Sequence, residues 1–64
     1  MGKVKEGMTS DEILKKLGKP NGPSEVLGED DPSVVWPYRH VKIHFKKRER
    51  DGITAWRVVK RARP

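Results

Sequence analysis

The two histidines, His40 and His44, are the first residues to consider for chemistry, because imidazole serves both as a metal ligand and as a general base. They lie in a stretch that alternates polar and apolar residues, which is typical of a half-buried strand. Side chains four residues apart on a strand share a face but are separated by about 13 Å. We therefore expect no shared metal ion and place both histidines on the solvent-exposed face of a sheet.

The remaining nucleophiles and acids form no recognisable catalytic pattern. Tyr38 and the three serines have no neighbouring base that would activate a hydroxyl. The acidic run at 29–31 lacks the spaced oxygens and closing glutamate of a calcium loop. The chain has no phosphate-binding glycine loop and no cysteine, which excludes disulfides and thiolate zinc sites. We expect no catalytic residue, no metal, no cofactor and no enzymatic activity.

Charge is the strongest remaining functional signal. The net charge is +6, but residues 1–35 carry −2 and residues 36–64 carry +8. A basic half raises the question of an anionic partner. The candidate binding residues are Arg39, Lys42, His44, Lys46, Arg48, Arg50 and Arg57.

Composition and length predict one small folded domain over residues 1–64, with 1–6 and 62–64 loosely held. Hydrophobic residues make up 33% of the chain, yet they cluster in periodic stretches, which favours folding over disorder. No apolar run is long enough for a transmembrane helix.

A short helix is predicted over residues 10–17. Thr9 and Glu12 have capping-box spacing at its start, and Gly18 followed by a proline ends it. The helix would bury an apolar stripe formed by Ile13, Leu14 and Leu17, with Met8 packed across the cap.

The rest of the chain predicts strands. Residues 33–39 are rich in β-formers, residues 40–47 alternate clearly, and residues 53–61 follow a turn at 48–52. The segment 24–28 fits either a single helical turn or a short strand.

Two residues bear on how these strands pair. Pro37 lacks an amide donor, so residues 33–39 are expected at a sheet edge or a bulge. In the last strand, Trp56 and Val58 are expected to face inward because Arg57 lies on the other face.

These elements predict an α+β domain, with one short N-terminal helix packed on a three- to four-stranded antiparallel β-meander. The residues expected to build this frame are Met8, Thr9, Ile13, Leu14, Leu17, Gly18, Trp36, Val41, Ile43, Phe45, Trp56 and Val58.

The stretch 4–20 resembles the opening motif of the SmpA/OmlA (BamE-like) small domain family. The matching residues are Gly7, Met8, Thr9, Glu12, Ile13, Leu17, Gly18 and Pro20, followed by the pair Trp36 and Tyr38, then Phe45 before Asp51-Gly52. The resemblance implies an α+β domain that binds other proteins without catalysis, in the bacterial periplasm or cell envelope. The chain departs from the family in lacking a leader and a lipobox cysteine, and in its basic sheet.

Two functions therefore remain open. The first is a non-catalytic protein-binding or scaffold module of the SmpA/OmlA type. The alternative is nucleic-acid or anionic-surface binding through the basic strands, with Trp36, Tyr38 or Trp56 stacking on bases where they are exposed beside the cations. Against the alternative, the aromatic residues of so small a chain are needed for its core, and the charges keep a bare sheet face soluble.

Overall fold

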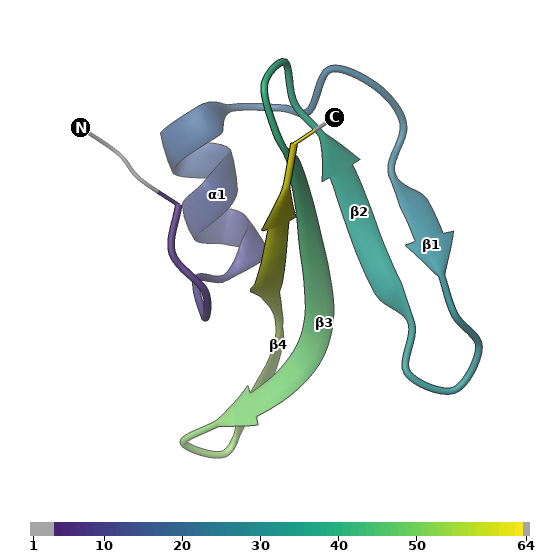
Figure 1. Ribbon diagram of the computed structural model, residues 1–64. Helices are drawn as coiled ribbons and strands as arrows, with labels where there is room; N and C mark the ends of the chain where they lie inside the picture. Colours follow the sequence, from purple (N-terminus) through teal and green to yellow (C-terminus); the bar gives the residue numbers. More distant parts are fainter. Residues whose placement is uncertain (1–3, 64) are drawn as a thin grey trace.

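The computed structural model describes residues 4–63 and has one helix followed by four strands (Figure 1). The elements in chain order are α1 (Ser10–Leu17), β1 (Glu25–Leu27), β2 (Ser33–Pro37), β3 (Lys42–Arg50) and β4 (Ile53–Ala62). The strands form one antiparallel sheet in the order β1-β2-β3-β4, and α1 packs beside β4 on one face. The predicted α+β meander is confirmed.

The helix begins and ends where the sequence predicts. The amide of Glu12 donates to the Thr9 hydroxyl at 3.3 Å, and the Thr9 amide donates to the Glu12 carboxylate at 3.2 Å. At the other end, Gly18 has a φ of +75° and its amide donates to the Leu14 carbonyl at 2.9 Å. A capping box and a glycine stop therefore define this eight-residue helix.

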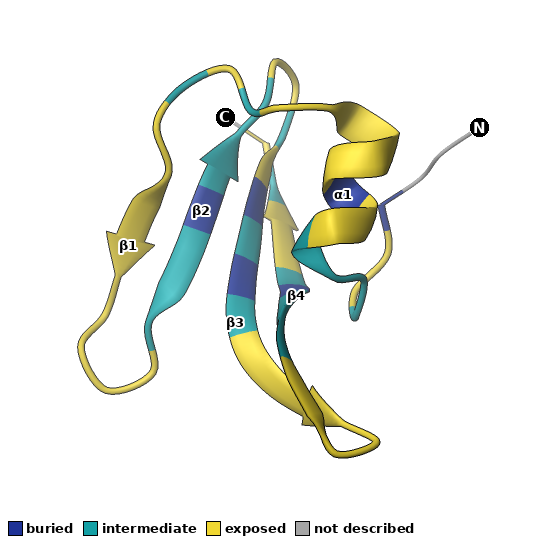
Figure 2. Ribbon diagram, turned by 180° about the vertical axis from the view of Figure 1, so that it is seen from behind, coloured by how far each residue is buried: buried dark blue, intermediate teal, exposed yellow. Residues whose placement is uncertain are grey.

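The core lies between α1 and the sheet (Figure 2). Its buried members are Val4, Ile13, Ile43, Phe45 and Val58, with Met8, Val34, Trp36, Tyr38, Val41 and Trp56 packed around them. Val4 is buried. Residues 1–3 and 64, which belong to the ends expected to be loosely held, lie outside the described residues.

The predicted helix stripe is wrong at two of its three positions. Ile13 is fully buried, but Leu14 is 40% exposed and Leu17 is 37% exposed. Val4 and Met8, which precede the helix, join Ile13 in or against the core. The short helix therefore has one fully buried anchor, and the described part of the chain has no second layer to cover its leucines.

The two turns that flank β3 differ from the predicted ones. Residues 38–41 form the β2–β3 turn, closed by the Tyr38 amide donating to the Val41 carbonyl at 2.8 Å. His40 therefore lies in a turn, not on the strand predicted from residue 40. At the far end, Asp51 and Gly52 have φ values of +53° and +77°, as a tight type I′ hairpin requires. The strand β3 thus continues to Arg50, where a turn from residue 48 was expected.

The prediction that the Pro37 strand is an edge is also wrong, because β2 lies between β1 and β3. The amide and carbonyl of a strand residue point to the same side. The Pro37 carbonyl accepts the Asn21 amide at 2.8 Å, so its missing donor faces that loop and not β3. The edge strand on that side is β1, so the segment 24–28 contains a short strand, Glu25–Leu27, whose Val26 is 66% exposed.

The strand β4 has a bulge where it pairs with β3, and its other edge is covered by the N-terminal segment. Phe45 pairs with Val58 and His44 pairs with Lys60, so Val59 is an extra residue at a bulge. On the free edge of β4, Val58 exchanges two 2.8 Å hydrogen bonds with residues 7 and 8. The N-terminal segment therefore covers the edge of the strand that carries the last core residue.

Candidate functional site

The sheet separates aromatic and basic side chains onto opposite faces. Directly paired residues of an antiparallel sheet share a face, and the buried pair Phe45–Val58 identifies the side that packs against α1. We call this side the helix face; it also carries Val34, Trp36, Ile43, Lys47 and Trp56. The opposite side, the open face, carries Lys42, His44, Lys46, Arg48 and Arg50 from β3 and Arg57 and Lys60 from β4.

The helix face holds an apolar pocket of about 160 Å³ beside the start of α1. Its lining residues are Ser10, Val34, Trp36, Phe45 and Trp56. The Trp36 and Phe45 rings meet edge to face, with centroids 4.7 Å apart at 61°. An apolar cavity of about 150 Å³ takes up a molecule the size of benzene, so this pocket has room for one aromatic or branched side chain.

Both tryptophans are half-buried, which leaves part of each indole available at the pocket. The Lys47 ammonium lies 5.5 Å from the centre of the Trp56 ring, within the range of a cation–π contact. The pocket therefore combines apolar walls with one positive charge at the indole. This chemistry suits an apolar group next to a carboxylate.

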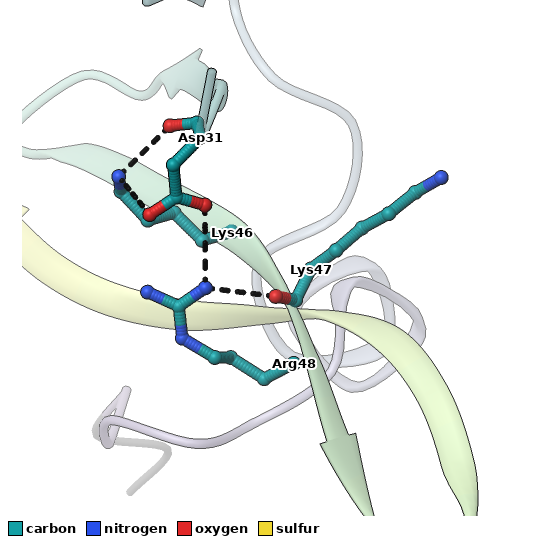
Figure 3. Close-up of polar contacts among 4 residues, drawn as sticks. All are labelled: Asp31, Lys46, Lys47 and Arg48. Atoms are coloured by element: carbon teal, nitrogen blue, oxygen red, sulfur yellow. Dashed lines mark hydrogen bonds and ion pairs between the residues drawn. The ribbon is translucent and has the colours of Figure 1, made fainter.

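On the open face, one aspartate from the β1–β2 loop ties two cations together (Figure 3). The Lys46 ammonium contacts the Asp31 carboxylate at 2.8 Å and its carbonyl at 2.9 Å. Arg48 contacts the other carboxylate oxygen at 3.4 Å and donates to the Lys47 carbonyl at 2.8 Å. The hydrogen bonds from Lys46 and then Arg48 lower the pKa of Asp31 below its ordinary value of 3.8.

A second group of residues on the open face, His44 with its two neighbouring lysines, lies outside the reach of Asp31. His44 pairs directly with Lys60 and lies two residues from Lys42 on the same strand face. Burial, then the charges of Lys60 and Lys42, lower the pKa of His44 below its ordinary value of 6.5. The two lysines beside His44 concentrate positive potential at this end of β3.

The structure brings together most, but not all, of the sequence-predicted binding residues. Lys42, His44, Lys46, Arg48 and Arg50 share the open face. Arg39 lies in the exposed β2–β3 turn, away from this row. Arg61, another cation of β4, pairs with Ile43 after the bulge and donates to the Val4 carbonyl on the helix face.

Arg57 has a structural environment within the open face. Its guanidinium donates to the Gly7 carbonyl at 2.8 Å, while its Nε is buried without a hydrogen-bond partner. The side chain is half-buried and holds the N-terminal segment against β4. Its charge is therefore less available to a ligand than that of its exposed neighbours.

The expected aromatic platform beside the cations is absent from the described open face. Trp36 and Trp56 line the pocket on the helix face. Tyr38 packs against the core and its hydroxyl donates to the Gly18 carbonyl at 2.8 Å, where burial raises its pKa. Base stacking by these residues on the basic face is therefore excluded by geometry.

Sequence reasoning missed three contributors. Val35 is 3% exposed although it faces the open side, between its cross-strand partners Glu25 and His44. Asp31 contacts Lys46, and Ser10 lines the pocket with residues of the sheet. These partners are 15 or more positions away in the sequence, so no local pattern predicts them. For Val35, its place between Val34 and Trp36 in a continuous apolar stretch was a usable signal of burial on both faces.

Within residues 4–63, no three histidine or carboxylate side chains are grouped closely enough to hold a metal ion. In the same part of the chain, no helix has the length and apolar character needed to cross a membrane. The arrangement supports binding chemistry on two faces, an apolar pocket and a cationic sheet surface. Comparison with known proteins finds no matching family model, no similar curated protein and no similar solved structure.

Proposed function

We propose that this domain is a non-catalytic protein-binding module that receives one apolar side chain of a partner protein in the pocket between Trp36 and Trp56. The observation that carries the proposal is the pocket itself, about 160 Å³ with apolar walls and two half-buried indoles. Tryptophan at the centre of an apolar depression is the residue type that most often dominates binding energy in protein interfaces.

Charge narrows the class of partner. The chain carries +6, and Lys47 places a positive charge at Trp56. An acidic partner segment would be steered toward this domain and would present a carboxylate to Lys47 beside its apolar anchor. The resemblance of residues 4–20 to the SmpA/OmlA motif supports the same class of function, and we extend the proposal to a protein of the bacterial cell envelope.

A displayed library of random peptides tests the pocket. We expect selected peptides to share a large apolar residue flanked by acids, and to quench or shift tryptophan fluorescence on binding. Ser10→Phe would fill the pocket from its rim and should abolish binding. The matched control is Ser24→Phe, the same substitution in an exposed loop, which should leave binding unchanged.

Two outcomes would overturn the proposal. One is selection of peptides without any common apolar residue. The other is equal binding by the Ser10→Phe and Ser24→Phe variants, with near-ultraviolet circular dichroism confirming that both are folded.

A further inference from the structure

We propose that the open face is a second binding surface, which holds the phosphate backbone of double-helical nucleic acid without reading its sequence, and that Asp31 masks part of it. This surface lies across the sheet from the tryptophan pocket and is independent of the protein-binding proposal.

The geometry of β3 carries the argument. Every open-face position of this strand is a cation or a histidine, from Lys42 to Arg50. Alternate side chains of a strand are about 6.7 Å apart, so the row extends for about 27 Å. Duplex DNA carries one negative charge per roughly 1.7 Å of its axis. A continuous row of cations along one strand is therefore matched to a linear polyanion more closely than to a single anionic group.

Cations outnumber acids on the described part of this face, where Glu25 lies beside Val35 and Asp31 reaches in from the β1–β2 loop. Among the described residues, Asp31 is the one acid in ion-pair contact with it, and it reaches only Lys46 and Arg48. Lys42, two residues before His44 on β3, and Lys60, its partner on β4, make no ion pair with any residue of the described part of the chain. Burial is the larger cause of the lowered pKa of His44, and the charges of Lys60 and Lys42 lower it further.

The same face lacks what other classes of partner require. Single-stranded nucleic acid is held by aromatic side chains that stack on bases, and the aromatic rings of this sheet lie on the helix face. A protein interface usually centres on a desolvated apolar anchor. At the middle of the open face, the apolar side chain is Val35, which is already buried, and the exposed Leu27 and Ile53 lie apart from each other, on the edge strand β1 and at the β3–β4 hairpin. Backbone phosphate contact needs neither feature.

Fluorescence anisotropy with a labelled 20-base-pair duplex, titrated from 25 to 200 mM KCl, tests the surface. Three to five phosphate contacts predict a slope of log K against log salt between about −2.7 and −4.5. Lys42→Gln with Lys60→Gln should reduce the steepness by about 1.8 and weaken binding by on the order of 10²-fold at low salt. The matched control, Lys15→Gln with Lys16→Gln on α1, removes the same charge and should have a far smaller effect.

Removing the Asp31 carboxylate should change duplex binding in the opposite direction. Asp31→Asn should release Lys46 and Arg48, tighten duplex binding severalfold and steepen the salt slope by about 0.9 to 1.8. Asp11→Asn, an equal change of charge on α1, is the control and should leave the slope unchanged.

Three results would overturn the inference. The first is no duplex binding at 25 mM KCl, or binding that does not change with salt. The second is an equal effect of each variant and its control, which would show that net charge alone acts. The third is equally tight binding of polyglutamate at the same residues, which would assign the face to an acidic protein.

Discussion

The burial difference between Ile13 and Leu17 gives a quantitative prediction about what holds the helix on the sheet. Ile13 is fully buried among Val4, Ile43, Phe45 and Val58. Replacing it by alanine removes three carbon atoms, each contributing about 0.8 kcal/mol of transfer free energy. With the cavity left behind, Ile13→Ala should cost about 3–4 kcal/mol. A domain of this length is stable by roughly 3–10 kcal/mol in total, so the loss is large.

Leu17 was expected to be as important, but its 37% exposure reduces the effect. Leu17→Ala removes the same three carbons from a site that is already partly in water, and water fills the space. We expect a cost of about 1.5 kcal/mol, without a cavity contribution.

Urea unfolding followed by tryptophan fluorescence measures both changes. At an m-value of about 1 kcal/mol/M, Leu17→Ala should lower the midpoint by about 1.5 M, and Ile13→Ala by at least twice as much. If Ile13→Ala is unfolded in water, Ile13→Val keeps the test measurable, with an expected cost of about 1 kcal/mol. Equal costs for the two alanine variants, or no cost for Ile13→Val, would refute the assignment of Ile13 as the anchor.

Three further predictions concern local contacts. Thr9→Ala removes the capping box and should cost about 1 kcal/mol in urea unfolding, whereas Thr9→Ser, which keeps the hydroxyl, should cost much less. Tyr38→Phe removes the hydrogen bond to the Gly18 carbonyl and should cost about 1 kcal/mol; a cost near zero would show that this contact is not formed in solution. His44 has a lowered pKa, so the unfolded state binds more protons and stability should fall as pH drops below about 6.5. Urea midpoints measured between pH 7 and 5 should therefore depend less on pH in His44→Gln. Asp31 and Glu12 also have lowered pKa values, but their protonation reduces stability only below about pH 4.5, outside this range.

The sequence predicted those parts of the fold that depend on neighbouring residues. The cap at Thr9, the stop at Gly18 and the hairpin at Asp51-Gly52 are each decided within a few residues, and all three are present. The alternation in β3 also predicted which of its side chains face the helix. Burial of Leu14 and Leu17 was predicted wrongly because it depends on what other segments cover, and a helical stripe carries no information about that.

The strand containing Pro37 shows a different limit. A missing amide donor excludes a residue from a ladder only on the side to which the amide would point. The sequence does not show that β1 stops pairing at Val35, so it could not show that the side of Pro37 without a donor faces a loop. The bulge at Val59 had no local signal either, and it decides that Lys60 faces the open side while Arg61 turns to the helix face.

The candidate sites followed the same division between local and tertiary information. Period-two alternation predicted the cations of β3 on one face, but the position of the aromatic side chains relative to them depended on the strand register. Once the register places Trp36 and Trp56 across the sheet from Lys42 and Lys60, no single ligand of ordinary size can use both groups. Two binding surfaces back to back could instead be occupied at once, and we expect a peptide in the pocket to leave duplex binding on the open face unchanged. Competition between the two ligands would show that one of the surfaces has been assigned to the wrong side of the sheet.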